Sequence, residues 1–240
     1  MANYKNPPIK TVSCEMKLRK DGWNDIFIGQ LYDKLKDKYP LYDSVVRIIN
    51  YYDKDKKSIF PKEIKETKLY REGSEDCFFV SPNRVEFQKN GNYEGWDIIK
   101  GEIVDVFSAY LQIVNPEKIK LLNLNYFNRI DIPVVLGQEY IDSVEYFNID
   151  IDIRKLSFGH SCFQSDLRLL FDTGEKSQLE LTLSDVVFNE NELSNMVGIA
   201  YKSFDYVDVN NIGDNLDVAH SQIEKLFEEL ITDKTRGLFY

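Results

Sequence analysis

The sequence has few cysteines and histidines, the residues on which disulfide scaffolds and soft-metal sites depend. Its three cysteines, Cys14, Cys77 and Cys162, lie far apart in 240 residues, and there are only two histidines. A disulfide framework needs an even set of cysteines, and a zinc ribbon needs closely spaced pairs. The composition therefore disfavours both of these, and it excludes a histidine-rich metal site.

Long apolar runs and glycine-rich motifs are also missing. No stretch of 18 apolar residues occurs, and the first eight residues contain no apolar signal core. None of the patterns G-x-x-x-x-G-K-[ST], G-x-G-x-x-G or G-x-S-x-G is present, so nucleotide cradles and nucleophile elbows have no support. We therefore expect a cytoplasmic protein that uses no cofactor and does not associate with a membrane.

Acidic residues outnumber basic ones by 40 to 30, which gives a formal net charge of −10. A surface of this sign repels phosphate backbones unless a local basic face compensates, so a nucleic-acid partner is disfavoured. The same charge favours solubility and fits a basic protein partner. With 15 Tyr and 15 Phe, the chain has the aromatic content of a folded protein.

Hydrophobic periodicity in the first half, residues 1–135, predicts strands that alternate with helices. The clearest helix spans residues 96–114, where apolar side chains recur every three or four positions until Asn115-Pro116. This order is compatible with a split β-α-β unit of ferredoxin-like type that carries an extra hairpin. The other expected elements are a strand at 11–19, a helix at 28–39, a strand at 45–52, a hairpin over 69–80 and a strand at 84–89.

The second half, residues 136–240, reads as an antiparallel β-meander followed by a C-terminal helix that begins near Asp217. Its expected strands lie at 149–153, 163–171, 179–183 and 199–209. We expect the two halves to pack as one unit, and the sequence leaves open whether they share a sheet. The predicted class is therefore α+β, with helices on one face of a largely antiparallel sheet.

One stretch, residues 122–133, is predicted to be a central strand. Its even positions are apolar except for Asn128, and Pro133 ends it because proline cannot donate to a sheet ladder. A buried amide without partners costs about 1–3 kcal/mol, so Asn128 must find them. Either it pins the segment around Asn6-Pro7-Pro8, or it binds a ligand.

Several motifs together resemble a sporadically distributed, uncharacterised bacterial family of about this length, whose hallmark is an N-terminal Tyr-x-Asn-Pro-Pro-Ile motif. The sequence departs from it at Lys10-Thr11, where the family tends to place an acidic residue. A sporadic distribution is typical of toxin–antitoxin or phage-defence modules, an association rather than a mechanism. The motifs are Tyr4-x-Asn6-Pro7-Pro8-Ile9, Tyr93-x-Gly95-Trp96, Asn115-Pro116, Tyr126-x-Asn128-Arg129-Ile130-x-Ile132-Pro133 and Leu216-Asp217-x-Ala219-His220.

Catalytic candidates are sparse. Asp150 and Asp152 fall on one side of an expected strand, roughly 7 Å apart, where they could hold Mg²⁺ or simply face solvent. An upstream Gly-Ser helix entry, which a nucleotidyltransferase would need, is missing. His160 and Cys162 could act as base and nucleophile, but no third orienting group can be named.

The sequence therefore favours a non-enzymatic, protein-binding module, either antitoxin-like or associated with phage defence. We expect a protein partner encoded nearby, or a second copy of the chain. The alternative is a metal-dependent nucleotidyl- or phosphoryl-transfer enzyme that uses the paired aspartates. Binding of single-stranded RNA through Phe127 and Arg129 is a third hypothesis. The candidate binding residues are Tyr4, Asn6, Tyr126, Asn128 and Arg129, and no metal ligand is predicted.

Overall fold

The computed structural model describes residues 4–18, 24, 26–53, 57–116, 118–133, 143–149, 166–189, 192–207 and 210–240. Within these residues the chain forms nine strands, four α-helices and one short 3-10 turn. In chain order they are β1 (Ile9–Leu18), α1 (Ile26–Leu35), β2 (Leu41–Asp53), β3 (Ser58–Tyr70), β4 (Cys77–Ser81), β5 (Arg84–Asn90), α2 (Trp96–Val114), β6 (Ile119–Pro133), η1 (Ser143–Glu145), β7 (Asp166–Gly174), β8 (Ser177–Asn189), β9 (Glu192–Val207), α3 (Ile212–Leu230) and α4 (Asp233–Gly237).

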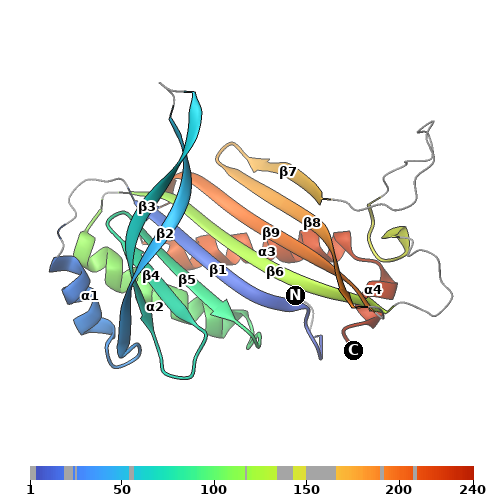
Figure 1. The fold of residues 1–240 in the computed structure, drawn as a ribbon, viewed down its shortest axis with the longest axis horizontal. Coiled ribbons are helices and arrows are strands. Elements are labelled where there is room, and N and C mark those ends of the chain that lie inside the picture. The colour runs from blue at the N-terminus through green and yellow to red at the C-terminus, as the bar shows by residue number, and fades with distance from the viewer. Residues whose placement is uncertain are drawn as a thin grey trace.

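All nine described strands belong to one antiparallel sheet, in the order β2-β3-β4-β5-β1-β6-β9-β8-β7 (Figure 1). The central strand predicted from the sequence is β6, which pairs with β1 on one side and with β9 on the other. Because β1 comes from the first half and β9 from the second, β6 joins the two halves into a single sheet. The predicted α+β class with a largely antiparallel sheet is confirmed.

The first half has the split β-α-β arrangement expected from its element order. Strand β5 lies between β4 and β1, and β6 follows on the far side of β1. The hairpin predicted over residues 69–80 is the β3–β4 connection, where Thr67–Tyr70 pairs with Cys77–Val80. A second hairpin, β2–β3, lies at the edge of the sheet. It was not predicted, because only the last residues of β3 were expected to be extended, whereas the strand begins at Ser58.

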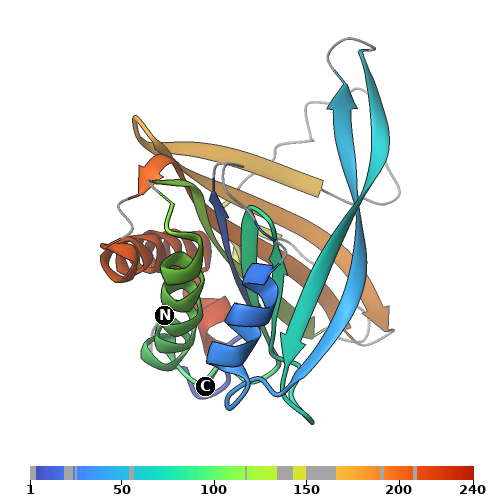
Figure 2. The ribbon, with the colours of Figure 1, turned by 90° about the vertical axis from the view of Figure 1, so that its left-hand side faces the viewer.

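The helices α2 and α3 lie on the same side of the sheet (Figure 2). The apolar stripe of α2 is buried there, including Ile103 and Phe107, which are fully inaccessible to solvent. The helix ends as predicted: Asn115 adopts a left-handed conformation with φ 46°, and its amide donates to the Leu111 carbonyl. Pro116 then prevents a further turn. None of the described helices is long and apolar enough to cross a bilayer.

The second half contains the predicted meander, β7-β8-β9, and the closing helix α3. Several boundaries differ from prediction: β8 and β9 are longer than expected, spanning Ser177–Asn189 and starting at Glu192, and α3 starts at Ile212 rather than near Asp217. Ile212 is 4% exposed, so its burial extends the apolar face of the helix by one turn. Most of the strand expected at 149–153 lies outside the described residues.

A polar cluster beneath the helices connects α2, α3 and β6. The Tyr126 hydroxyl lies 3.0 Å from His220 Nδ1, and the His220 ring stacks on Trp96 with centroids 4.4 Å apart. Trp96 Nε1 donates to Asp217 at 2.8 Å, and Lys100 pairs with the same carboxylate. Burial lowers the pKa of His220 to about 4, so its imidazole is neutral at physiological pH.

We predict that this histidine makes folding sensitive to acid. In the unfolded chain His220 titrates near 6.5, and in the fold near 4, so the unfolded state binds more protons between these values. The free energy of unfolding should therefore fall by about 2–3 kcal/mol as the pH drops from 6.5 to 4, with no further contribution below that. Urea unfolding at a series of pH values measures this change.

The matched control is His220→Gln, which cannot take up a proton. Protonation of carboxylates whose pKa is lowered in the fold also destabilises both proteins in acid. The informative quantity is therefore the free energy of unfolding of the parent minus that of the variant. This difference should become smaller as the pH falls from 6.5 to 4. Parallel profiles across this window would show that His220 does not titrate differently on folding. The acidic residues near His220 are Asp217 and Glu224. The Glu224 carboxylate lies 3.9 Å from His220 Nε2, and both residues are present in the parent and in the variant.

Candidate functional site

One face of the sheet carries no described helix, and we call it the open face. On β6 the even positions point under the helices, whereas Asn123, Asn125, Phe127 and Arg129 point to the open face. This face is polar over most of the sheet, in contrast to the apolar side that packs on α2 and α3. It is therefore the broadest surface on which the described residues could bind another molecule.

The predicted site residues do not gather at one place. Tyr126 and Asn128 are fully buried on the helix-covered side, and only Arg129 reaches the open face, where its Nε donates to Asp131 at 2.7 Å. Asn128 donates to the Val197 carbonyl at 3.2 Å, and its Oδ1 finds no partner among the described residues. The amide thus bonds across to β9 rather than to the N-terminal segment.

Tyr4 and Asn6 lie against the C-terminal end of the chain. The Tyr4 hydroxyl donates to Glu228 at 2.8 Å, and burial together with that carboxylate raises the pKa of Tyr4 to about 12. The Asn6 amide donates to the Phe239 carbonyl at 2.9 Å. The Pro8 carbonyl accepts from the Arg129 amide, so the N-terminal motif does meet the β6 motif, through backbone contacts.

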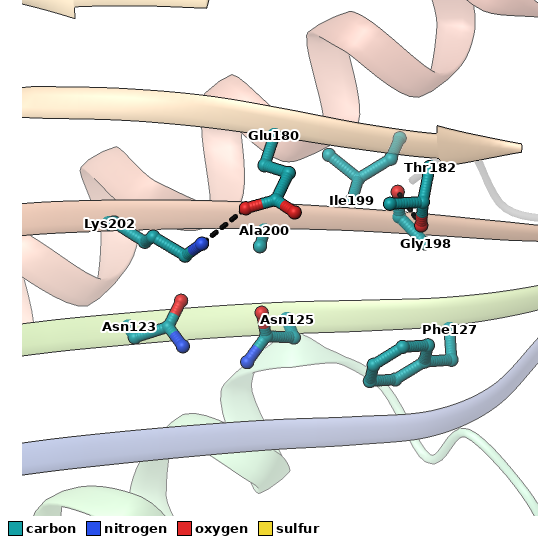
Figure 3. A pocket seen from close by; sticks show the side chains of 9 residues that line it. All are labelled: Asn123, Asn125, Phe127, Glu180, Thr182, Gly198, Ile199, Ala200 and Lys202. Atoms are coloured by element: carbon teal, nitrogen blue, oxygen red, sulfur yellow. Dashed lines mark hydrogen bonds and ion pairs between the residues drawn. The ribbon is translucent and has the colours of Figure 1, made fainter. Parts of the chain in front are cut away.

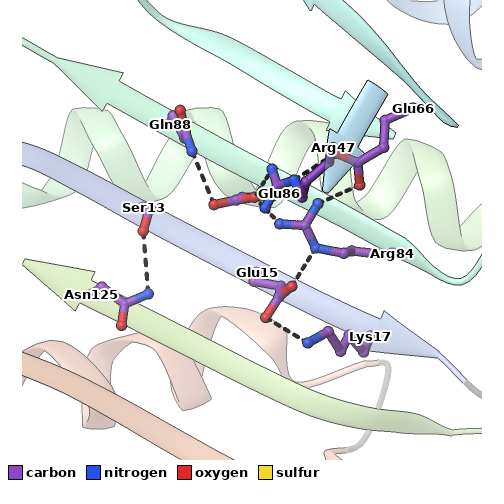
Figure 4. Close-up of polar contacts among 9 residues, drawn as sticks. All are labelled: Ser13, Glu15, Lys17, Arg47, Glu66, Arg84, Glu86, Gln88 and Asn125. Atoms are coloured by element: carbon purple, nitrogen blue, oxygen red, sulfur yellow. Dashed lines mark hydrogen bonds and ion pairs between the residues drawn. The ribbon is translucent and has the colours of Figure 1, made fainter. Parts of the chain in front are cut away.

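A cluster of charged side chains crosses the open face at the base of the β2–β3 hairpin (Figure 4). Arg84 is its centre: it pairs with Glu15 on β1, Glu66 on β3 at 2.6 Å, and Glu86 on β5. Arg47 on β2 approaches Glu66 and Glu86 at 2.9 and 2.8 Å. Four strands are therefore tied together by side chains as well as by backbone pairing.

These charges are largely removed from water. Glu66 is 3% exposed, and Arg84 and Glu86 are 8% exposed. Burial raises the pKa of Glu15, but the hydrogen bond and charge of Arg84 outweigh that effect and hold it below its usual range. A buried charge that loses its partner is costly, so this cluster fixes the hairpin to the sheet rather than offering free charges to a ligand.

A shallow groove opens on the other part of this face, across β6, β9 and β8 (Figure 3). It has a volume of about 180 Å³. Its floor is β9 at Gly198 and Ala200, where large side chains are missing. The polar and aromatic side chains around it are Asn123, Asn125, Phe127, Glu180, Thr182 and Lys202.

The glycine is required at one end of the groove. A Cβ at position 198 would lie 2.5 Å from the Thr182 hydroxyl and 3.5 Å from the Phe127 ring. Both side chains therefore lean over the Gly198 backbone. Phe127 remains 43% exposed, so its ring is accessible to a molecule that binds the open face.

The far end of the groove carries charged side chains that pair with one another. Glu180 pairs with Arg168 on β7 and with Lys202 on β9. The hydrogen bond from Arg168 holds the pKa of Glu180 below its usual range, so the carboxylate is ionised, and both of its oxygens already have a cationic partner. Between the two ends, Asn125 donates to Ser13 at 3.2 Å, and the buried Oδ1 of Asn123 finds no partner among the described residues.

Sequence reasoning singled out Phe127 but missed the rest of the groove. The alternation of Leu179, Leu181 and Leu183 does place Glu180 and Thr182 on the opposite face of their strand. Nothing in the sequence pattern, however, indicates that β9 lies between β6 and β8. Only that order brings side chains separated by more than fifty residues to one groove.

The candidate catalytic residues Asp150, Asp152, His160 and Cys162 lie outside the described residues. Among the residues that are described, no group of three or more His, Cys, Asp or Glu side chains could hold a metal ion. Cys14 and Cys77 are buried and free, and burial raises the pKa of the Cys14 thiol. None of these observations favours the nucleotidyl- or phosphoryl-transfer hypothesis.

Comparison of the chain with protein-family models finds no match, and comparison with curated proteins finds no significant relative. The resemblance based on the Tyr4-x-Asn6-Pro7-Pro8-Ile9 motif therefore stays a prediction.

We predict that Arg84→Met lowers the free energy of unfolding by about 3–5 kcal/mol, because it leaves buried carboxylates without their central cation. The matched control is Arg168→Met, which breaks an arginine–glutamate pair on the same face whose arginine is 64% exposed. That change should cost less than about 1 kcal/mol. Urea denaturation of both variants measures the difference, and equal losses would show that the buried cluster has no special structural role.

Proposed function

We propose that the chain is a non-enzymatic, protein-binding module whose partner docks on the open face over the groove. The observation that carries this proposal is the groove itself. It combines an exposed aromatic ring with charged groups that are already neutralised. These are features of a surface that recognises another molecule, and they do not make a reactive centre.

The composition of the groove argues for binding rather than chemistry. No histidine or cysteine lines it within the described residues, and Glu180, its one carboxylate, is held ionised between two cations. A general base needs a pKa near the working pH, and that of Glu180 is shifted away from it. The volume of about 180 Å³ is also small beside the roughly 300–1,000 Å³ of typical small-molecule sites.

A protein partner fits these features better than a small ligand does. Aromatic rings at the centre of a contact and charged groups at its rim are the usual arrangement of protein interfaces. Phe127 supplies the ring, and Lys202 and Glu180 supply the rim. Asn123 Oδ1 is closed to solvent, so the contacts with the partner are made by the accessible groups around it, Phe127, Lys202 and Glu180.

We extend the proposal to the kind of partner on the basis of the family resemblance alone. A protein encoded close to this chain's gene, as in an antitoxin or phage-defence module, is the partner that a sporadic distribution favours. The net charge of −10 suits a basic partner, since opposite charges increase the rate of encounter. Affinity purification from the native host, followed by mass spectrometry, would identify the partner.

We predict that Ala200→Arg weakens this interaction. The long side chain would fill the groove between Asn125 and Glu180, the residues that pair with and flank position 200. Affinity for the partner should fall at least roughly tenfold, equivalent to about 1.4 kcal/mol, while the fold is retained. Titration of the purified partner, with circular dichroism and thermal melting as checks on folding, measures this.

The control is Val218→Arg, on the exposed side of α3, where the valine is 52% accessible. It introduces the same side chain on the helical side of the molecule and should leave affinity unchanged. Full binding by the Ala200→Arg variant would place the contact elsewhere. Failure to recover any stoichiometric partner from the native host would count against a protein-binding role.

A further inference from the structure

The β2–β3 hairpin projects beyond the rest of the sheet. Strand β4 pairs only with Thr67–Tyr70 of β3, so residues 45–53 and 58–66 have no third strand beside them among the residues that the structure describes. We call these residues the arm. Figure 2 shows it extending away from α2 and α3, beyond the body of the molecule. A two-stranded ribbon is marginally stable by itself in water, so an arm of this length gains stability by pairing further.

The outer edge of the arm is β2, which within the described residues has a neighbour on one side only. Val46 and Ile48 are 56% and 67% exposed, and Ile59 on β3 is 66% exposed. These three belong to one face of the ribbon, because Ile59 pairs with Tyr52, which lies an even number of residues from Val46 and Ile48. Apolar, β-branched side chains thus lie on a strand whose outer edge is unpaired among the described strands.

The two edges of the sheet differ in how they are protected. Charged residues punctuate β7 at Asp166, Arg168 and Asp172, and natural edge strands use such charges to prevent pairing. Between Ser44 and Tyr52, β2 has only one charge, Arg47. That guanidinium is turned inward to Glu66 and Glu86, so it does not guard the edge. The sequence of β2 therefore permits the pairing that β7 resists.

We propose that β2 pairs antiparallel with β2 of a second copy of this chain, across a two-fold axis near Arg47. The apolar residues of the strand are self-complementary about Arg47. The two Arg47 side chains would lie opposite each other, each neutralised by Glu66 and Glu86 of its own chain. Val46 of one copy would face Ile48 of the other on one side of the ribbon, and Val45 would face Ile49 on the other side. Cross-strand pairs of β-branched residues are favourable, and isologous contact is the commonest symmetry of homo-oligomers.

Charge makes contact between two hairpins less repulsive than contact between two bodies. Residues 41–70 contain seven basic and five acidic residues, whereas the other 210 residues contain 23 basic and 35 acidic. The hairpin is therefore net +2 and the remainder net −12. Contact between two acidic bodies would be repulsive, but pairing through the projecting arms keeps those bodies apart.

A charge-swap experiment tests the proposal. The parent chain should sediment as a dimer in the low micromolar range. Val46→Lys/Ile48→Lys places lysines opposite lysines and should weaken the dimer by roughly 100-fold or more, as should Val46→Glu/Ile48→Glu with like carboxylates. An equimolar mixture of the two variants should restore the dimer, because each lysine then faces a glutamate. Sedimentation velocity measures all four samples.

Val218→Lys, at an equally exposed valine on α3, is the control and should dimerise like the parent. A parent that stays monomeric up to about 100 µM overturns the proposal, as does a dimer that survives in either double variant. Failure of the mixture to associate would show that β2 does not pair with its own copy. The groove variant Ala200→Arg should remain dimeric, so this proposal and the protein-binding function can fail independently.

Discussion

The pairing of β6 with both β1 and β9 is the contact on which the rest of the structure depends. It extends over the length of the longest strand in the first half, and it joins two segments that would otherwise form separate sheets. The burial pattern of β6 alternates without interruption from Leu122 to Ile132. A shift of one residue in this register would expose that whole set, so the alternation fixes the pairing on both sides.

The single sheet has two unequal faces as a consequence. Both long helices pack on the side where β6 presents its apolar residues, and the polar cluster of Tyr126, His220 and Trp96 forms where they meet the strand. The opposite side receives the charged and amide residues of the same strands. It is organised into a buried ion cluster at one end and an open groove at the other. The groove is thus accessible because the helices cover only the other face of the sheet.

The ion cluster and the arm are connected physically. Arg47 forms ion pairs with Glu66 and Glu86 at the base of the β2–β3 hairpin, and these pairs hold the base of the hairpin to the sheet. The same contact removes the only charge from the middle of β2. An interaction that stabilises the fold therefore also leaves the edge of the arm unprotected, and this links the fold to the proposed self-pairing.

Local patterns in the sequence determined the elements and their faces. The period of β6, the stripe of α2 and its end at Asn115-Pro116 depend on neighbours within a few residues, and all three were predictable. The polar break at Asn128 was also visible in sequence, although its partner on β9 was not. The meander of β7, β8 and β9 was predictable, but tertiary structure alone decided that β9 lies beside β6, and so it alone assembled the groove from β6, β8 and β9. Contacts between residues far apart in the sequence depend on the order of strands in the sheet. The two-residue alternation within a strand is the same whatever strands lie beside it, so it does not reveal that order.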